Sequence, residues 1–102
     1  MTPWFAALVH GPSMAPALRH GDALLVRRGD RAVRAGDVVV VRFAARPGEL
    51  FVKRVARREG TGGWVLGDNE FVTDDSRAYG VAEAVGRVVL RWWPRPTWVR
   101  RR

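Results

Sequence analysis

The hydrophobic positions of this chain fall into short runs that are separated by glycine, proline and acidic turn residues. No run keeps a helical period for more than about two turns. Most runs are rich in valine or aromatic residues, which favour strands. Such spacing is typical of an all-β domain, a small barrel-like or folded antiparallel sheet with little helix. The predicted strands cover residues 4–9, 23–26, 37–43, 50–55, 64–66 and 85–93.

A run of valines and three Gly-Asp pairs refine this pattern. The segment 37–43 contains four consecutive valines, and a run without polar alternation is typical of a strand buried on both faces. The Gly-Asp pairs stand at 21–22, 36–37 and 67–68, next to predicted strands, and such pairs favour turns.

The chain has 102 residues and a net charge of +8, from 17 arginines and one lysine against ten acidic residues. This length supports one core, so we expect one domain over 1–94 and a basic, frayed tail over 95–102. A basic surface can attract nucleic acid or anionic lipid. The arginines are scattered, however, so we expect no nucleic-acid partner. Tryptophan and arginine alternate near the tail, which leaves peripheral membrane contact open.

Composition excludes several kinds of chemistry. The chain has no cysteine, so disulfides, thiolate metal sites and a cysteine nucleophile are ruled out. The two histidines, His10 and His20, lack a ligand partner at helical spacing, and neither a metal site nor a cofactor is expected. The apolar run at 4–9 is far shorter than the ~20 residues of a spanning helix and lacks the basic flank of a secretion signal. The expected location is the cytoplasm.

One of the two serines occupies a rigid turn. Ser13 stands in His-Gly-Pro-Ser-Met-Ala-Pro at 10–16, where glycine and proline restrict the backbone. A serine nucleophile needs such a placement, because its hydroxyl must project while nearby N–H groups face the oxyanion. Most Gly-Pro-Ser turns are only turns, so this segment alone leaves both interpretations open.

The single lysine is the second candidate for chemistry. Lys53 lies in the apolar segment Leu-Phe-Val-Lys at 50–53, although arginine is used at 17 other positions. Guanidinium stays protonated in proteins, whereas a buried ammonium loses its proton more readily. A neutral amine can then accept the proton of a serine hydroxyl. On composition alone, a chance surface lysine is an equally good interpretation.

A polar loop at 67–77 is the third candidate segment, and it begins with Gly-Asp-Asn. Asp75 and Arg77 are spaced to form an ion pair that holds the loop, and Thr73 is placed to hydrogen-bond a nearby amine. An ordinary solvated loop is the alternative.

In this order, the three segments resemble those of the S26 signal peptidase family of Ser/Lys peptidases. The nucleophile segment is Gly-Pro-Ser-Met-x-Pro-x-Leu-x-x-Gly-Asp at 11–22, and the lysine segment ends in Lys-Arg-Val at 53–55. The third segment is the loop at 67–77, with Tyr-Gly at 79–80. The resemblance covers residues 9 to about 93. It implies a β fold of the LexA/signal peptidase type and peptide-bond hydrolysis without a cofactor.

The functional residues of the family carry over position by position. Ser13 matches the nucleophile, Lys53 the general base and Thr73 the hydroxyl that orients the lysine. A hydroxyl that often stands two residues before the nucleophile is replaced by Gly11, so the oxyanion hole would rest on backbone N–H groups, chiefly that of Ser13. Positions that shape the site are Met14, Gly67, Asp68, Asn69, Asp75 and Arg77. Positions that would flank an extended protein substrate are Ala6, Ala7, Leu8, Leu50, Phe51 and Val52.

The short form without a membrane anchor is similar to the proteases that mature nickel-type superoxide dismutase. This likeness implies a serine endopeptidase that removes a leader peptide, with the metal belonging to the substrate. Three alternatives stay open: signal-peptidase-like processing of another precursor, a self-cleaving domain of the LexA type, and a catalytically inactive basic binding module.

Overall fold

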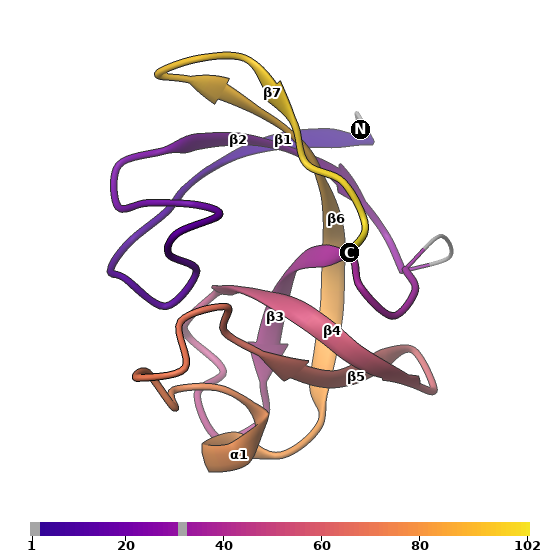
Figure 1. The fold of residues 1–102 in the computed structure, drawn as a ribbon. Coiled ribbons are helices and arrows are strands. Elements are labelled where there is room, and N and C mark those ends of the chain that lie inside the picture. Colours follow the sequence, from indigo (N-terminus) through magenta and orange to yellow (C-terminus); the bar gives the residue numbers. More distant parts are fainter. Residues whose placement is uncertain (1–2, 31–32) are drawn as a thin grey trace.

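Strands dominate the computed structural model, which describes residues 3–30 and 33–102 (Figure 1). All strand pairings are antiparallel, and the helix in these ranges is a single turn. The predicted all-β class is therefore confirmed. The elements are β1 (Trp4–Leu8), β2 (Ala23–Arg28), β3 (Val38–Phe43), β4 (Phe51–Glu59), β5 (Gly62–Leu66), α1 (Ser76–Tyr79), β6 (Ala82–Trp93) and β7 (Thr97–Trp98).

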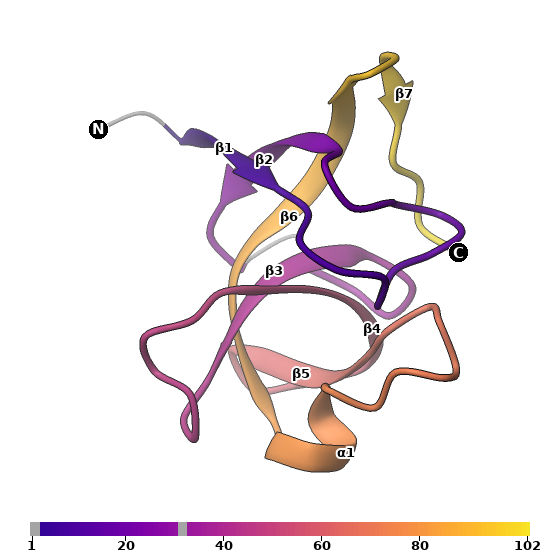
Figure 2. The same cartoon turned by 90° about the vertical axis from the view of Figure 1, so that its left-hand side faces the viewer.

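The long strand β6 organises the sheet. The strand order is β1-β2-β6-β3-β4-β5, and an additional pairing between β6 and β5 closes a small barrel of β3, β4, β5 and β6. The upper half of β6 pairs with β2 and β7, so β1, β2 and β7 extend the sheet beyond the barrel (Figures 1 and 2). Closure requires glycine, because a Cβ at Gly62 would lie 1.7 Å from the carbonyl oxygen of Ala82.

The four valines of β3 are buried on both faces, as predicted. Val38 and Val40 belong to a core between the β1–β2 extension and the barrel. Val39 and Val41 belong to a second core inside the barrel, with Phe43. Successive side chains of a strand point to opposite faces, so one run of valines serves both cores. Full burial of a valine contributes roughly 1.5–3 kcal/mol.

Four strands extend beyond their predicted bounds, and two short elements were not predicted. β2 continues to Arg28 and β5 begins at Gly62. β4 continues to Glu59 and β6 begins at Ala82. The charged end of β4 resembles a loop in sequence, yet it is paired with β5. The helix α1 and the two-residue β7 are too short for a periodic signal. In the described ranges, the longest helix has four residues, far fewer than a bilayer requires.

The C-terminal segment differs from the frayed tail expected over 95–102. β7 pairs with β6, and the N–H of Val99 donates to the carbonyl oxygen of Val89 at 2.9 Å. Arg101 then forms two hydrogen bonds with the buried carboxylate of Asp37, at 2.7 and 3.1 Å. A buried carboxylate is costly without a cation or donors, which explains why this segment lies against the sheet. The predicted boundary at residue 94 stays a prediction.

Candidate active site

Ser13 lies in the connection between β1 and β2, which doubles back on itself. The N–H of Val9 donates to Asp22 O at 2.9 Å, and that of Ala15 donates to Pro12 O at 3.0 Å. Met14 is completely buried and anchors the connection in the core. Its role in shaping the site stays a prediction. Ser13 itself is half-buried. The local sequence thus holds a partly accessible hydroxyl in a rigid turn.

Lys53 is almost fully buried in β4, with 2% of its surface exposed, and it lies opposite Val39 of β3. Its ammonium makes no hydrogen bond or ion pair with residues 3–30 or 33–102, and it lies 5.8 Å from the Phe51 ring centroid. Burial lowers the pKa of the Lys53 ammonium below its ordinary value, and Arg77 acts in the same direction. The carboxylates of Asp75 and Asp74 oppose this shift without cancelling it.

Ser13 and Lys53 line one cavity of about 290 Å³. Their side chains are not hydrogen-bonded to each other in the described structure, and apo enzymes often show such loose geometry. Of the predicted substrate-flanking residues, Leu8, Leu50, Phe51 and Val52 line this cavity, whereas Ala6 and Ala7 do not. Among the described residues, its charged ones are Glu49, Asp74 and Lys53, and none of the arginines described lines it.

The cavity lies between two sheet edges. Among the described strands, β1 pairs only with β2, and residues 51–53 of β4 pair only with β3. The free edges retain main-chain N–H and C=O groups that an added strand can bond.

The predicted turn at 67–69 holds the backbone of Ser13. The Asn69 N–H donates to Ser13 O at 2.9 Å, and the Asn69 side-chain amide donates to Pro12 O at 3.1 Å. A Cβ at Gly67 would lie 2.6 Å from Ser13 O, so only glycine permits this approach. These contacts explain why glycine stands at position 67 and asparagine at position 69.

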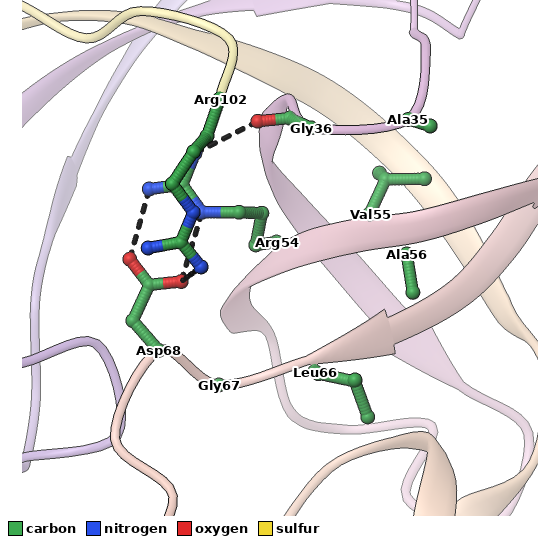
Figure 3. A pocket seen from close by; sticks show the side chains of 9 residues that line it. All are labelled: Ala35, Gly36, Arg54, Val55, Ala56, Leu66, Gly67, Asp68 and Arg102. Carbon is green, nitrogen blue, oxygen red and sulfur yellow. Dashed lines mark hydrogen bonds and ion pairs between the residues drawn. The ribbon is translucent and has the colours of Figure 1, made fainter.

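Asp68 connects this turn to the strand of Lys53 through Arg54, a residue that the sequence analysis did not single out. The Arg54 guanidinium forms two hydrogen bonds with the Asp68 carboxylate, each of 2.8 Å, and a third with Gly36 O at 2.7 Å. Arg102 reaches the same carboxylate at 3.3 Å (Figure 3). These groups line a second cavity, about 380 Å³, which contains neither Ser13 nor Lys53. With 17 arginines in the chain, no sequence signal indicates which one pairs with Asp68.

Asp75 and Arg77 form the predicted ion pair, with 2.7 Å between Arg77 Nη2 and Asp75 Oδ2. Asp75 also caps α1 by accepting the Arg77 N–H, and it accepts the Gly67 N–H at 3.1 Å. Burial alone would raise the pKa of the Asp75 carboxyl, but these hydrogen bonds outweigh it and hold the pKa below its ordinary value. Next to it, the buried hydroxyl of Ser76 accepts the Val65 N–H at 2.8 Å. This second serine is therefore structural.

Thr73 is exposed, and no hydrogen bond in the described ranges involves it. Its neighbour Asp74 lines the cavity instead and accepts a hydrogen bond from the Tyr79 hydroxyl. The lysine-orienting role of Thr73 stays a prediction.

Few N–H groups near Ser13 are available to an oxyanion. The Gly11 N–H donates to Nδ1 of His20 at 2.9 Å, and Pro12 has no N–H. The Ser13 N–H donates no hydrogen bond within residues 3–30 and 33–102, so it is free to stabilise a developing negative charge.

Comparison with known families gives a match over most of the chain. The chain belongs to the Peptidase S24-like family, whose model matches residues 2–89. It is thus a serine-peptidase-like domain of the LexA/signal peptidase type. No individual curated protein matches the chain.

Proposed function

We propose that this chain is a serine endopeptidase in which Ser13 is the nucleophile and Lys53 the general base. One observation carries the proposal: the only lysine is buried without a hydrogen-bond or ion-pair partner in the described ranges, and it lines the same cavity as Ser13. Burial favours the neutral amine, which is the form that accepts a proton.

In the proposed reaction, neutral Lys53 takes the proton of Ser13 as Oγ attacks the carbonyl carbon of the scissile peptide bond. The Ser13 N–H stabilises the oxyanion of the tetrahedral intermediate. Lys53 then gives its proton to the leaving amine, and the C–N bond breaks to leave an acyl ester on Ser13. Water, deprotonated by Lys53, attacks the ester and releases the acid product, returning the proton to Ser13.

The two free sheet edges support an extended protein substrate. A substrate strand between β1 and residues 51–53 would bond main-chain groups on both sides, and Leu8 and Val52 would contact its side chains. A cavity of about 290 Å³ favours small side chains. Recognition through the main chain also suits cleavage of an extended leader rather than of folded protein.

The two serines form a matched pair of variants that tests this function. Ser13→Ala should abolish cleavage and leave stability unchanged, because its half-exposed hydroxyl bonds nothing in the described structure. Ser76→Ala should keep cleavage at low temperature but lose about 1–3 kcal/mol of stability, because the buried Val65 N–H loses its acceptor. Rates of product formation and urea unfolding measure the two effects. Cleavage by Ser13→Ala would refute the proposed nucleophile.

For the substrate, we propose the precursor of a nickel-type superoxide dismutase, on the likeness of the Gly-Pro-Ser-Met segment and the Arg/Trp-rich end to its maturation proteases. Incubation with that precursor, followed by sequencing of the new N-terminus, tests this substrate. An intact precursor would exclude it and favour another leader peptide. The mass of the enzyme after mildly alkaline incubation tests the alternative of self-cleavage: we expect an unchanged mass.

A further inference from the structure

The face of the β1–β2–β6–β7 extension that points away from both cores is apolar at the end nearest β7. Directly opposite residues of antiparallel strands share one face of the sheet. The strand register gives two apolar rows on this face, Leu25, Leu90 and Trp98 in one and Leu8, Ala23 and Trp93 in the other, followed by a third row of Trp4, Arg27 and Arg87. We name the six residues of the two apolar rows the outer face. Both ribbon views place its strands at the end of the molecule opposite α1 (Figures 1 and 2).

The outer face is exposed at its largest residues. Leu8 and Trp93 are each 59% exposed, and Trp98 is 63% exposed. The inner face of the same strands provides core residues such as Leu24 and Val88. A sheet with one face in water normally alternates apolar and polar residues, whereas the two rows of the outer face are apolar on the water-facing side as well. Contiguous exposed apolar surfaces of this kind mark interaction sites.

The charges around the outer face are of one sign. Nine of the ten acidic residues lie between positions 30 and 83, and residues 84–102 contain six arginines and no acid. The remaining acid, Asp22, is buried and lies 3.7 Å from the Arg91 guanidinium. Arg27 lies over the Trp4 ring at 5.3 Å, and Arg95 and Arg100 are exposed beside β7. An apolar face with a positive rim complements an anionic interface.

We propose that the outer face binds the surface of a membrane that contains anionic phospholipids. Tryptophan favours the boundary between water and the hydrocarbon layer, and arginines near an anionic leaflet are attracted to its headgroups. A second copy of the chain fits less well, since two faces with positive rims would repel each other.

The outer face adjoins the candidate active site. Leu8 belongs both to this face and to the lining of the cavity that contains Ser13 and Lys53. A protein bound through the outer face therefore holds the cavity near the lipid boundary. The proposal itself rests on the sheet register, exposure and charge, and it is independent of catalysis.

Sedimentation with lipid vesicles tests the proposal on the full chain. We expect the protein to sediment with phosphatidylcholine vesicles that contain phosphatidylglycerol, less so at high salt, and not with pure phosphatidylcholine. The double variant Trp93→Ala/Trp98→Ala should lower the partition coefficient by about tenfold or more, because two rings leave the interface. Phe71→Ala is the matched control: Phe71 is 88% exposed but lies in the 67–75 loop, and its loss should change nothing.

A second pair of variants tests the contribution of charge. Arg100→Gln should weaken binding about fivefold, the equivalent of about 1 kcal/mol per basic residue near an anionic surface. Arg34→Gln removes the same charge from an exposed position away from the outer face and should have little effect. Trp98→Glu provides a single substitution at an exposed site if the double variant misfolds.

Three results would overturn the proposal. The first is equal sedimentation with anionic and neutral vesicles. The second is wild-type binding by folded Trp93→Ala/Trp98→Ala or Trp98→Glu. The third is a dimer in the absence of lipid that these variants dissociate, which would show that a second copy covers the outer face.

Discussion

Lys53 and Arg54 are consecutive cations on β4, but their surroundings in the folded protein are opposite. Their side chains point to opposite faces of the strand. Lys53 is buried in the cavity with Ser13 and makes no hydrogen bond or ion pair in the described ranges. Arg54 donates three hydrogen bonds, two to Asp68 and one to Gly36 O.

The positive charges of Arg54 and Lys53 therefore serve different purposes. On the Arg54 side, a bidentate pair fixes the 67–69 turn, which in turn contacts the backbone of Ser13. On the Lys53 side, burial without an ion-pair partner in the described part of the chain leaves an amine that loses its proton more readily. One cation is suited to hold the site together, and the other is suited to exchange a proton.

Exchanging the two cations tests this comparison most strongly. Lys53→Arg should lower cleavage of a true substrate by about 10³-fold or more, because guanidinium cannot act as a base at working pH. Arg54→Lys should keep cleavage within about tenfold of wild type, since an ammonium still pairs with Asp68. Initial rates of both variants provide the measurement. Equal cleavage rates for Lys53→Arg and Arg54→Lys would show that the two cations do not differ in their role in catalysis.

Removing the partner of Arg54 should lower stability. Asp68→Asn leaves a guanidinium without its carboxylate, and breaking such a largely buried pair costs about 3 kcal/mol. Urea unfolding measures the change, with Glu70→Gln as an exposed control expected within about 0.5 kcal/mol of wild type. An unaffected Asp68→Asn would mean that the turn is held by other contacts.

The pH dependence of stability should reveal the buried amine. The pKa of Lys53 is lowered by folding, so the unfolded chain binds more protons between the folded pKa and the ordinary value of 10.5. Stability therefore rises with pH across that window, by at most about 1.4 kcal/mol per pH unit. Lys53→Met should lack this rise and be more stable than wild type at neutral pH. If the stability of wild type and of Lys53→Met changes with pH in the same way, folding does not lower the pKa of Lys53.

The smallest effect is expected at the C-terminal segment. Arg101 is 42% exposed although its partner Asp37 is buried, so Arg101→Ala should cost about 1 kcal/mol. Arg100→Ala, whose side chain makes no hydrogen bond or ion pair in the described ranges, should stay within about 0.5 kcal/mol of wild type. Thermal unfolding at low and high salt compares the two. A larger loss for Arg100→Ala would point to packing rather than charge.

Local patterns were sufficient to predict most of the strands. The valine run of β3 and the apolar segments of β1 and β2 were identified because strand propensity and alternation act over a few residues. The charged end of β4 was not predicted, since its place in the sheet depends on pairing with β5. β7 depends on pairing with β6, and the ordered C-terminal segment depends on Asp37, which is 64 residues from Arg101 in sequence.

The candidate site was predictable only in part. Ser13 and Lys53 are distinctive by rarity and setting, and they line one cavity. The exposed position of Thr73 and the bond from Gly11 to His20 were not visible in the sequence. Both depend on how loops meet in space, which no local propensity determines.

By itself, the sequence determined that this chain forms a small antiparallel sheet and that its one lysine stands in an apolar strand. Composition and short-range pattern are enough for these conclusions. Only the tertiary structure decided that Lys53 is buried without a paired anion among residues 3–30 and 33–102, whereas Arg54 beside it is paired with Asp68. The physical reason is that a residue's type specifies its charge, but desolvation and pairing come from segments that the fold brings together.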